Sequence, residues 1–178
     1  TFEKGFIYGI TAPSGTGKTT LLNLIGNILK PAQGEIETDF KTGIAYVFQE
    51  PELLSQLTIA ENIALPLATY LKKEIAFEQA ISILQKMELG GFENRFPNEL
   101  SFGQQQRAAI ARALTYPSPL LLMDEPFKGL DEALSRRIIK RIRERQTENG
   151  QTILFTSHNP GELRLFADKT VRLDPTSH

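Results

Sequence analysis

A glycine-rich turn near the start of the chain limits the possible folds more than any other feature. Residues 12–19 read Ala-Pro-Ser-Gly-Thr-Gly-Lys-Thr. They follow a candidate strand, residues 5–10, and precede a candidate helix, residues 18–29, whose apolar residues recur at helical spacing until Pro31. A strand that leads through a short turn into a helix opens a parallel strand–helix–strand unit. The turn therefore predicts an α/β protein.

The rest of the chain continues this alternation of short apolar runs with longer amphipathic ones. The further candidate strands are residues 44–48, 120–123, 152–155 and 169–173, the last of them an edge strand. The further candidate helices are two within residues 58–87, one at 101–116 and one at 130–149. Thr58 followed by Glu61 predicts a capping box on the first of these helices. We therefore expect a mostly parallel sheet flanked by helices.

Composition excludes several classes of protein. The chain has 178 residues, no cysteine and two histidines, so disulfide scaffolds, cysteine nucleophiles and multi-histidine metal cages are ruled out. Its net charge of −1 disfavours a dedicated nucleic-acid binder. The basic run between Arg136 and Arg145 is interpreted as a solvated helix face. No apolar run approaches the ~18 residues of a spanning helix, so we expect one domain that does not itself cross a membrane.

The turn also matches the phosphate-binding P-loop pattern, except that Ala12 replaces its first glycine. Small residues let successive backbone N–H groups surround a phosphate at the positive end of a helix. A left-handed backbone at Ala12 would cost ~1–2 kcal/mol over glycine. We expect Lys18 to neutralise the β- and γ-phosphates and the Thr19 hydroxyl to bind Mg²⁺. The candidate nucleotide-binding residues are Pro13, Ser14, Gly15, Thr16, Gly17, Lys18, Thr19 and Thr20.

Two carboxylates follow the most apolar candidate strand. Asp124 and Glu125 come directly after Leu120–Met123. The carboxyl ends of strands in an open α/β sheet border the crevice where ligands bind. Asp124 is therefore expected to hold the Mg²⁺, and Glu125 to orient or deprotonate the attacking water. Without the P-loop upstream, the same pair would be interpreted as a helix cap or a solvated turn.

Leu100–Arg107 reads Leu-Ser-Phe-Gly-Gln-Gln-Gln-Arg and closely resembles the LSGGQ signature of ATP-binding cassette (ABC) ATPases. Phe102 stands where that family prefers glycine. Other family elements follow in order: Gln49 resembles the Q-loop glutamine, residues 129–131 resemble the D-loop, and His158 resembles the switch histidine. The resemblance covers the chain from Gly5 to about Leu173. An isolated Ser-Phe-Gly or a single histidine would instead be interpreted as a helix cap and a structural residue.

The resemblance implies ATP and Mg²⁺ as ligands and a head-to-tail pair of cassettes. It implies that Ser101, Gly103 and Gln104 contact the nucleotide held by the second ATPase subunit. Catalytic roles fall on Glu125, His158, Gln49 and Lys18, and the implied metal ligands are Thr19, Gln49 and Asp124. His178, in the C-terminal tail, is expected to be disordered and to take no part.

The resemblance further implies a P-loop NTPase core with an inserted helical subdomain. We expect a single domain, 1–178, with residues 1–50 and 117–178 forming the core and 51–116 the helical subdomain with the signature helix. The family usually has a β-rich portion ahead of the P-loop strand, with an aromatic residue that stacks on adenine. Only eleven residues precede Ala12 here, and Phe2, Phe6 and Tyr8 are interpreted as sheet packing.

The function implied is the ATP-hydrolysing subunit of an ABC transporter. The phrases at 48–67 and 124–131 resemble bacterial importers, in particular the nitrate/sulfonate/taurine branch. The implied partners are transmembrane permease subunits, a second ATPase subunit and, indirectly, a solute-binding protein, with no nucleic acid. The implied place is the cytoplasmic face of the cell membrane, peripheral through the permease. The alternatives are a nucleotide-dependent scaffold with little turnover, which Ala12 and Phe102 favour, and a non-transport ABC ATPase.

Overall fold

The computed structural model describes residues 1–13, 15–37 and 43–173. Its strands are β1 (Ile7–Thr11), β2 (Ala45–Val47), β3 (Leu120–Met123), β4 (Thr152–Thr156) and β5 (Lys169–Arg172). Its α-helices are α1 (Lys18–Ile25), α2 (Ile59–Ala64), α3 (Lys73–Lys86), α4 (Phe102–Thr115), α5 (Glu132–Asn149) and α6 (Pro160–Phe166). Short 3₁₀ turns lie at Leu67–Thr69 and Pro97–Glu99. Ser14 and His178, both considered above, lie outside the described residues.

The five strands form one sheet in the order β2-β3-β4-β1-β5, and every neighbouring pair is parallel. The expected α/β class is confirmed, and β5 is an edge strand as predicted. Because all strands run the same way, the carboxyl ends of β1, β2, β3 and β4 meet at one edge of the sheet. This edge therefore brings together segments that lie far apart in the sequence.

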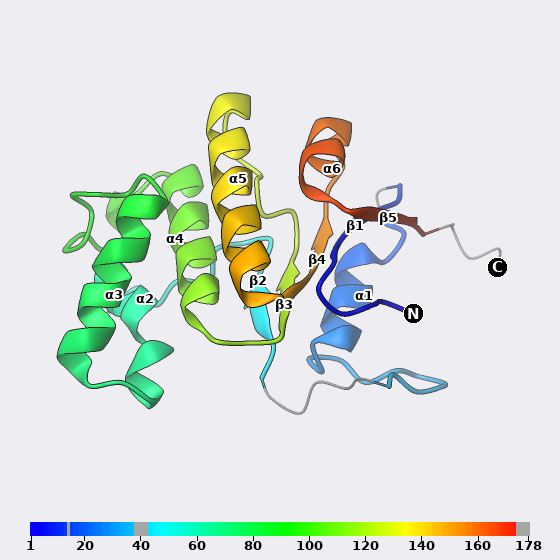
Figure 1. The fold of residues 1–178 in the computed structure, drawn as a ribbon, viewed down its shortest axis with the longest axis horizontal. Helices are drawn as coiled ribbons and strands as arrows, with labels where there is room; N and C mark the ends of the chain where they lie inside the picture. The colour runs from blue at the N-terminus through cyan, green and yellow to red at the C-terminus, as the bar shows by residue number, and fades with distance from the viewer. Residues whose placement is uncertain (14, 38–42, 174–178) are drawn as a thin grey trace.

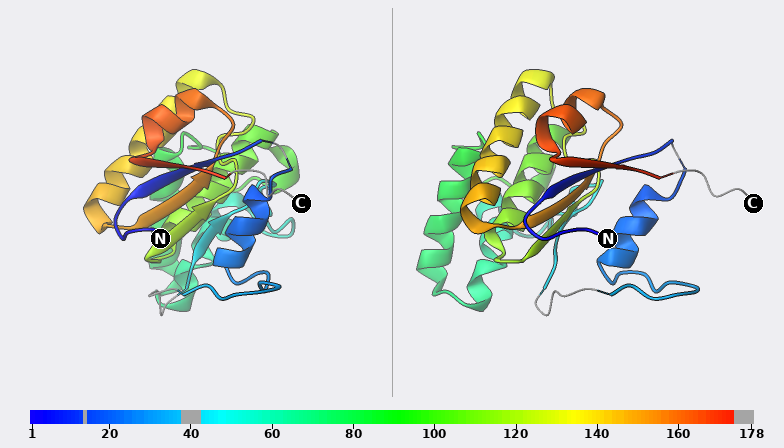
Figure 2. Two further views of the ribbon diagram at one scale, coloured as in Figure 1. Left: turned by 90° about the vertical axis from the view of Figure 1, so that its right-hand side faces the viewer. Right: turned by 45° about the vertical axis from the view of Figure 1, so that its right-hand side comes forward.

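Both faces of the sheet are covered, which explains why its central strands are apolar at successive positions. In β3, Leu121 and Met123 join the core beneath α5 and α6, whereas Leu120 and Leu122 join the core that includes Leu22 of α1. Figures 1 and 2 show α5 and α6 on one side of the sheet and α1 on the other. The fold is a three-layer sandwich with its chemistry at one edge.

Helices α2, α3 and α4 pack together beside the β2 end of the sheet (Figure 1). The predicted capping box is present, because the Thr58 hydroxyl accepts from the Glu61 N–H and the Glu61 carboxylate accepts from the Thr58 N–H. Within α2, Ile59 and Ile63 are fully buried. The side chain of Asn62, also fully buried, bonds the backbone of residues 54, 57 and 58 and so holds the segment after β2 against α2.

Two helices differ by more than two residues from the sequence-based expectation. Helix α1 ends at Ile25 rather than at 29, because Asn27 adopts a left-handed backbone (φ 57°) that a helix cannot continue through. Helix α6 was not expected. Its signals are Asn159, whose side chain accepts from the Gly161 N–H as N-cap, and Pro160 at the first helical position. Seven residues carry too little periodicity to reveal such a helix in advance.

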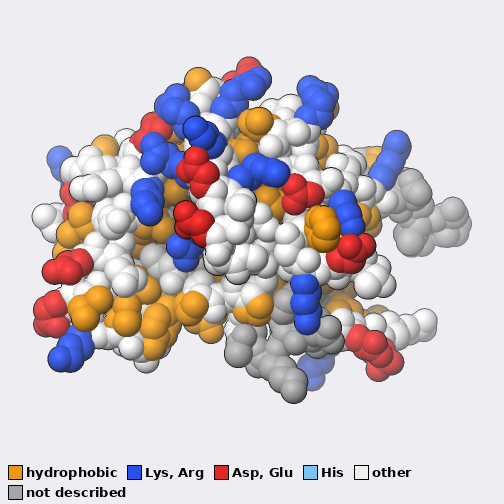
Figure 3. Space-filling model, in the orientation of Figure 1, with side chains coloured by type: hydrophobic (Ala, Val, Ile, Leu, Met, Phe, Trp, Pro, Cys, Tyr) orange, Lys and Arg blue, Asp and Glu red, His pale blue; other side chains and the backbone are white. Residues whose placement is uncertain are grey.

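The basic run lies on α5, and Figure 3 shows Lys and Arg side chains gathered over α5 and α6 with carboxylates among them. The pairs on this face are Arg136 with Glu132, Arg137 and Arg141 with Glu88, Lys140 with Glu144, and Arg143 with Asp168. The opposite side of α5 buries Ile138, Ile139 and Ile142. The interpretation as a solvated face fits these pairings. Among the described residues, no helix is long and apolar enough to span a membrane.

Candidate functional site

The turn between β1 and α1 leads into a helix whose first N–H groups have no partner within the helix itself. Gly15 and Gly17 have φ of 79° and 90°, values that only glycine adopts easily. Gly17 caps α1 without a side-chain hydrogen bond, and the first turn of α1 holds no acidic residue. The first N–H groups of α1 are therefore free to bind an anion, with the helix dipole favouring negative charge.

Lys18 lies folded over this turn. Its Nζ donates to the carbonyl oxygens of Ala12 and Pro13 at 3.0 and 3.3 Å, and the residue is only 7% exposed. Ala12 does not adopt a positive φ, so the cost considered for alanine at this position does not arise. The Thr16 hydroxyl donates to the Pro13 carbonyl at 2.7 Å, which closes the turn, whereas Thr19 and Thr20 are exposed at its rim.

Asp124, at the end of β3, is 2% exposed and accepts two hydroxyl hydrogen bonds. Thr19 donates to its Oδ2 and Thr156, at the end of β4, donates to its Oδ1, both at 2.6 Å. Burial, with the negative charge of Asp124 as a second cause, raises the pKa of the nearby Tyr46. Asp124 thus joins the end of β3 to the first turn of α1 and to the end of β4.

Glu125 and His158 contact each other directly. His158 Nε2 lies 2.8 Å from Glu125 Oε1, and their side chains are 45% and 24% exposed. Glu125 has a positive φ of 46°, uncommon for a residue with a side chain. Its N–H donates to Thr156 Oγ1 at 2.9 Å, which helps to hold this strained backbone. The pair stands at the edge of the site, open to solvent.

Gln49 follows β2, which pairs with β3 so that Val47 lies opposite Met123. This register places Gln49 at the same sheet edge as Asp124 and Glu125. No cluster of three or more metal-binding side chains is found among the described residues. The Thr19 hydroxyl and the Asp124 carboxylate nevertheless fit Mg²⁺, because that ion is usually held by one or two protein oxygens together with water and substrate phosphates.

The signature segment lies at the start of α4 rather than at the P-loop. Ser101 and Gln104 form a reciprocal capping box, in which Gln104 Oε1 accepts from the Ser101 N–H at 2.8 Å. Gly103 is needed for packing, because a Cβ there would lie 2.7 Å from the Gly129 carbonyl oxygen. The Phe102 ring also packs against Gly129, and Lys128 Nζ lies 5.6 Å from its centroid. The bulky side chain is therefore accommodated within its own chain.

Sequence reasoning did not assign a role to Thr156. This fully buried residue bridges Asp124 and Glu125 through one hydroxyl. The available signal was a polar residue directly after the apolar run Ile153–Phe155. Tyr8 packs within the sheet as expected, with Phe2 edge-on to it at 4.9 Å between ring centroids.

The comparisons with known proteins agree with this geometry. A family model described as ABC transporter matches residues 1–128. The thiamine import ATP-binding protein ThiQ of Shigella flexneri serotype 5b is 37% identical over 181 residues, covering 96% of this chain and 78% of that protein. ThiQ of Escherichia coli O157:H7 matches to the same extent.

Two similar solved structures are of the cassette MJ0796. A dimeric post-hydrolysis state bound to ADP and Pi has a TM-score of 0.91 at 34% identity, covering 98% of this chain and 84% of that one. A second dimeric structure, described as a bacterial ABC transporter cassette, has a TM-score of 0.89 at 33% identity, covering 97% of this chain and 83% of that one. Since the family model, the ThiQ relatives and these cassettes all match, the chain belongs to the ATP-binding cassette family of ABC transporter ATPases.

Proposed function

We propose that this chain binds Mg-ATP and hydrolyses it to energise solute import through separate membrane subunits. The observation that carries the proposal is the meeting of Lys18, the Thr19–Asp124 pair and the Glu125–His158 pair at one sheet edge. A cation, a metal-binding oxygen pair and a carboxylate–imidazole pair are the groups that phosphoryl transfer to water requires.

Each group then has a role in the reaction. Residues 13–19 surround the phosphates with backbone N–H groups, and Lys18 Nζ exchanges the carbonyls of Ala12 and Pro13 for the β- and γ-phosphates. Thr19, Asp124 and Gln49 would hold the Mg²⁺, and the ion would supply positive charge that offsets the negative charge of the phosphates. Glu125 accepts the proton of the attacking water, while ADP leaves from the γ-phosphorus.

His158 completes this proposed arrangement. Its Nε2 lies 2.8 Å from Glu125 Oε1. When ATP is bound, the imidazole donates to the γ-phosphate and keeps the water between that phosphate and Glu125. The half-exposed position of the imidazole leaves it free to make this contact.

The second ATPase subunit is proposed to complete the site. Helix α4 contacts β2, α2 and α3, whereas α1 contacts β4. We propose that Ser101, Gly103 and Gln104 contact a nucleotide held by a partner copy, where the N-terminus of α4 again favours an anion. The dimeric MJ0796 cassettes support this arrangement.

The remaining partners follow from the relatives. ThiQ is described as a thiamine import protein, which supports an importer with permease subunits and, indirectly, a solute-binding protein. The chain is then peripheral at the cytoplasmic face of the membrane. The solute is chosen by those other subunits, and the nitrate/sulfonate/taurine branch remains a prediction.

The proposed organisation is one domain with two parts. Residues 1–50 and 117–178 form the nucleotide-binding core, and residues 51–116 form a helical subdomain that receives the permease. The mutual packing of α2, α3 and α4 supports this division. Helix α4 also contacts β2, so the signature segment is tied to the core beside Gln49.

The test compares Glu125→Gln with the wild-type chain in ATP binding and steady-state hydrolysis. Binding should be retained, and turnover should fall by on the order of 10²–10⁴, the size of a general-base effect. Glu132→Gln is the matched control, because its carboxylate is 78% exposed and pairs only with the solvent-facing Arg136 among the contacts described above. Turnover that is unchanged in Glu125→Gln would contradict the role, and turnover that is negligible in wild type beside its permease would favour the scaffold alternative.

A further inference from the structure

A second carboxylate, Glu162 of α6, holds the turn that presents His158. Ser157 Oγ donates to Glu162 Oε2 at 2.5 Å, and Asn159 Nδ2 donates to Glu162 Oε1 at 3.4 Å. The Asn159 N–H also donates to Ser157 Oγ at 3.0 Å. One carboxylate therefore bonds the residue before His158 and the residue after it.

The two ends of this arrangement are differently exposed. Ser157 is 2% exposed, and its N–H donates to the Ile10 carbonyl of β1, so it is fixed to the sheet. The His158 side chain is 45% exposed, so packing does little to hold it. The orientation of the imidazole therefore depends on the backbone of residues 157–159 and on its contact with Glu125.

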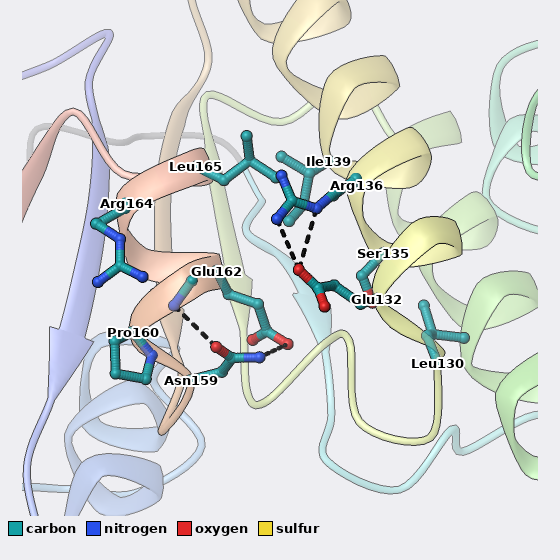
Figure 4. A pocket seen from close by; sticks show the side chains of 11 residues that line it. Leu130, Glu132, Ser135, Arg136, Ile139, Asn159, Pro160, Glu162, Arg164 and Leu165 are labelled. Carbon is teal, nitrogen blue, oxygen red and sulfur yellow. Dashed lines mark hydrogen bonds and ion pairs between the residues drawn. The ribbon is translucent and has the colours of Figure 1, made fainter.

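Figure 4 shows Glu162 reaching from α6 towards Asn159, whereas Arg164 on the same helix points away. Both residues line a cleft of about 520 Å³ between α5 and α6. Burial raises the pKa of Glu162, and its hydrogen bonds with Ser157 and Asn159 oppose that rise. Burying part of a carboxylate costs free energy. We therefore expect that residues 157–159 require the hydrogen bonds that Glu162 makes.

Resting on the role proposed above for His158, we propose that Glu162 is a positioning residue that fixes the His158 turn through Ser157 and Asn159. It does not contact nucleotide. It acts on turnover by keeping the imidazole in register with Glu125, and its loss leaves nucleotide binding at the P-loop unaffected.

The experiment measures kcat, the KM for ATP and the melting temperature for Glu162→Ala, in the wild-type background and in His158→Ala. In the wild-type background kcat should fall about 10-fold, because a misplacement of a catalytic group by about 1 Å can lower turnover by up to ~10². The KM for ATP should change less than about twofold. In the His158→Ala background the same substitution should change kcat by less than about twofold. A merely structural role would lower activity in both backgrounds.

Two further variants keep the test decisive. Glu162→Gln retains the size of the side chain and one acceptor oxygen, so it should fold and lose less activity than Glu162→Ala. Arg164→Gln is the control on the same helix and cleft, and its kcat should equal that of wild type.

The outcomes separate this inference from the proposed function. If His158→Ala keeps wild-type turnover, the role of His158 is wrong and this inference fails with it. If His158→Ala is slow but Glu162→Ala is as fast as wild type, or if Glu162→Ala lowers kcat equally in both backgrounds, only the positioning role of Glu162 is overturned.

Discussion

The hydroxyl of Thr156 should contribute more to the stability of this fold than its size suggests. Thr156→Val keeps the shape of the side chain but removes a donor to Asp124 at 2.6 Å and an acceptor for the Glu125 N–H at 2.9 Å. The residue is 0% exposed, so water does not readily replace either bond. The substitution therefore leaves a carboxylate oxygen and a backbone N–H without this partner.

The two losses have separate magnitudes. A hydrogen bond to a charged group contributes ~1.5–3 kcal/mol, and a buried donor left unpaired costs ~1–3 kcal/mol. The added methyl regains ~0.8 kcal/mol through burial. We therefore expect the free energy of unfolding to fall by about 3 kcal/mol, which for a chain of this length lowers the melting temperature by roughly 6–12 °C.

Urea unfolding followed by circular dichroism measures this change, because the chain has no tryptophan to report by fluorescence. Thr170→Val is the matched control, since Thr170 is an exposed residue of the edge strand β5. Its free energy of unfolding should stay within about 0.5 kcal/mol of wild type. A loss below about 1 kcal/mol in Thr156→Val would refute the reasoning that this hydroxyl joins β3 to β4.

Two more predictions concern single charged groups. Lys18→Ala should abolish detectable binding of Mg-ATP in calorimetry, because the cation expected on the β- and γ-phosphates is lost; micromolar affinity in that variant would contradict the P-loop assignment. The second concerns Glu162, whose pKa burial raises above the 4.5 of a free carboxyl. A raised carboxyl pKa favours folding below pH 4.5, and this advantage is lost as pH rises through the raised value. The stability of wild type relative to Glu162→Gln should therefore decline with rising pH in denaturation titrations, and a rise would show that the hydrogen bonds outweigh burial.

The fold was largely predictable because its signals are local. Leu120–Met123 forms β3 with the bounds expected, since an apolar run that ends in two carboxylates has few other interpretations. Helix α4 lacks only the first and the last residue of the expected range 101–116, because Ser101 is its N-cap and Tyr116 its C-cap. The end of α1 depended on the backbone of Asn27, which no apolar pattern encodes.

The site was predictable in its members but not in their contacts. The motifs indicated Lys18, Asp124 and His158 one at a time. That Thr156 bridges the ends of β3 and β4 depends on which strands become adjacent. That Glu162 bonds both neighbours of His158 depends on the turn into α6, a helix that the apolar pattern did not predict. Spatial adjacency of β3 and β4 is a property of the sheet order, and spacing along the chain does not reveal it.

The outer strand of the sheet also limits how two copies can meet. Lys169 and Arg172 lie on β5, whose free side is one margin of the sheet. Two molecules joined there as one continuous sheet would bring these like charges together, a device that proteins use against edge-to-edge aggregation. Lys169 is partly neutralised by Glu3, whose Oε1 lies 2.9 Å from its Nζ, but Arg172 carries a second positive charge on the same strand. Joining of two copies through β5 as one continuous sheet is therefore disfavoured.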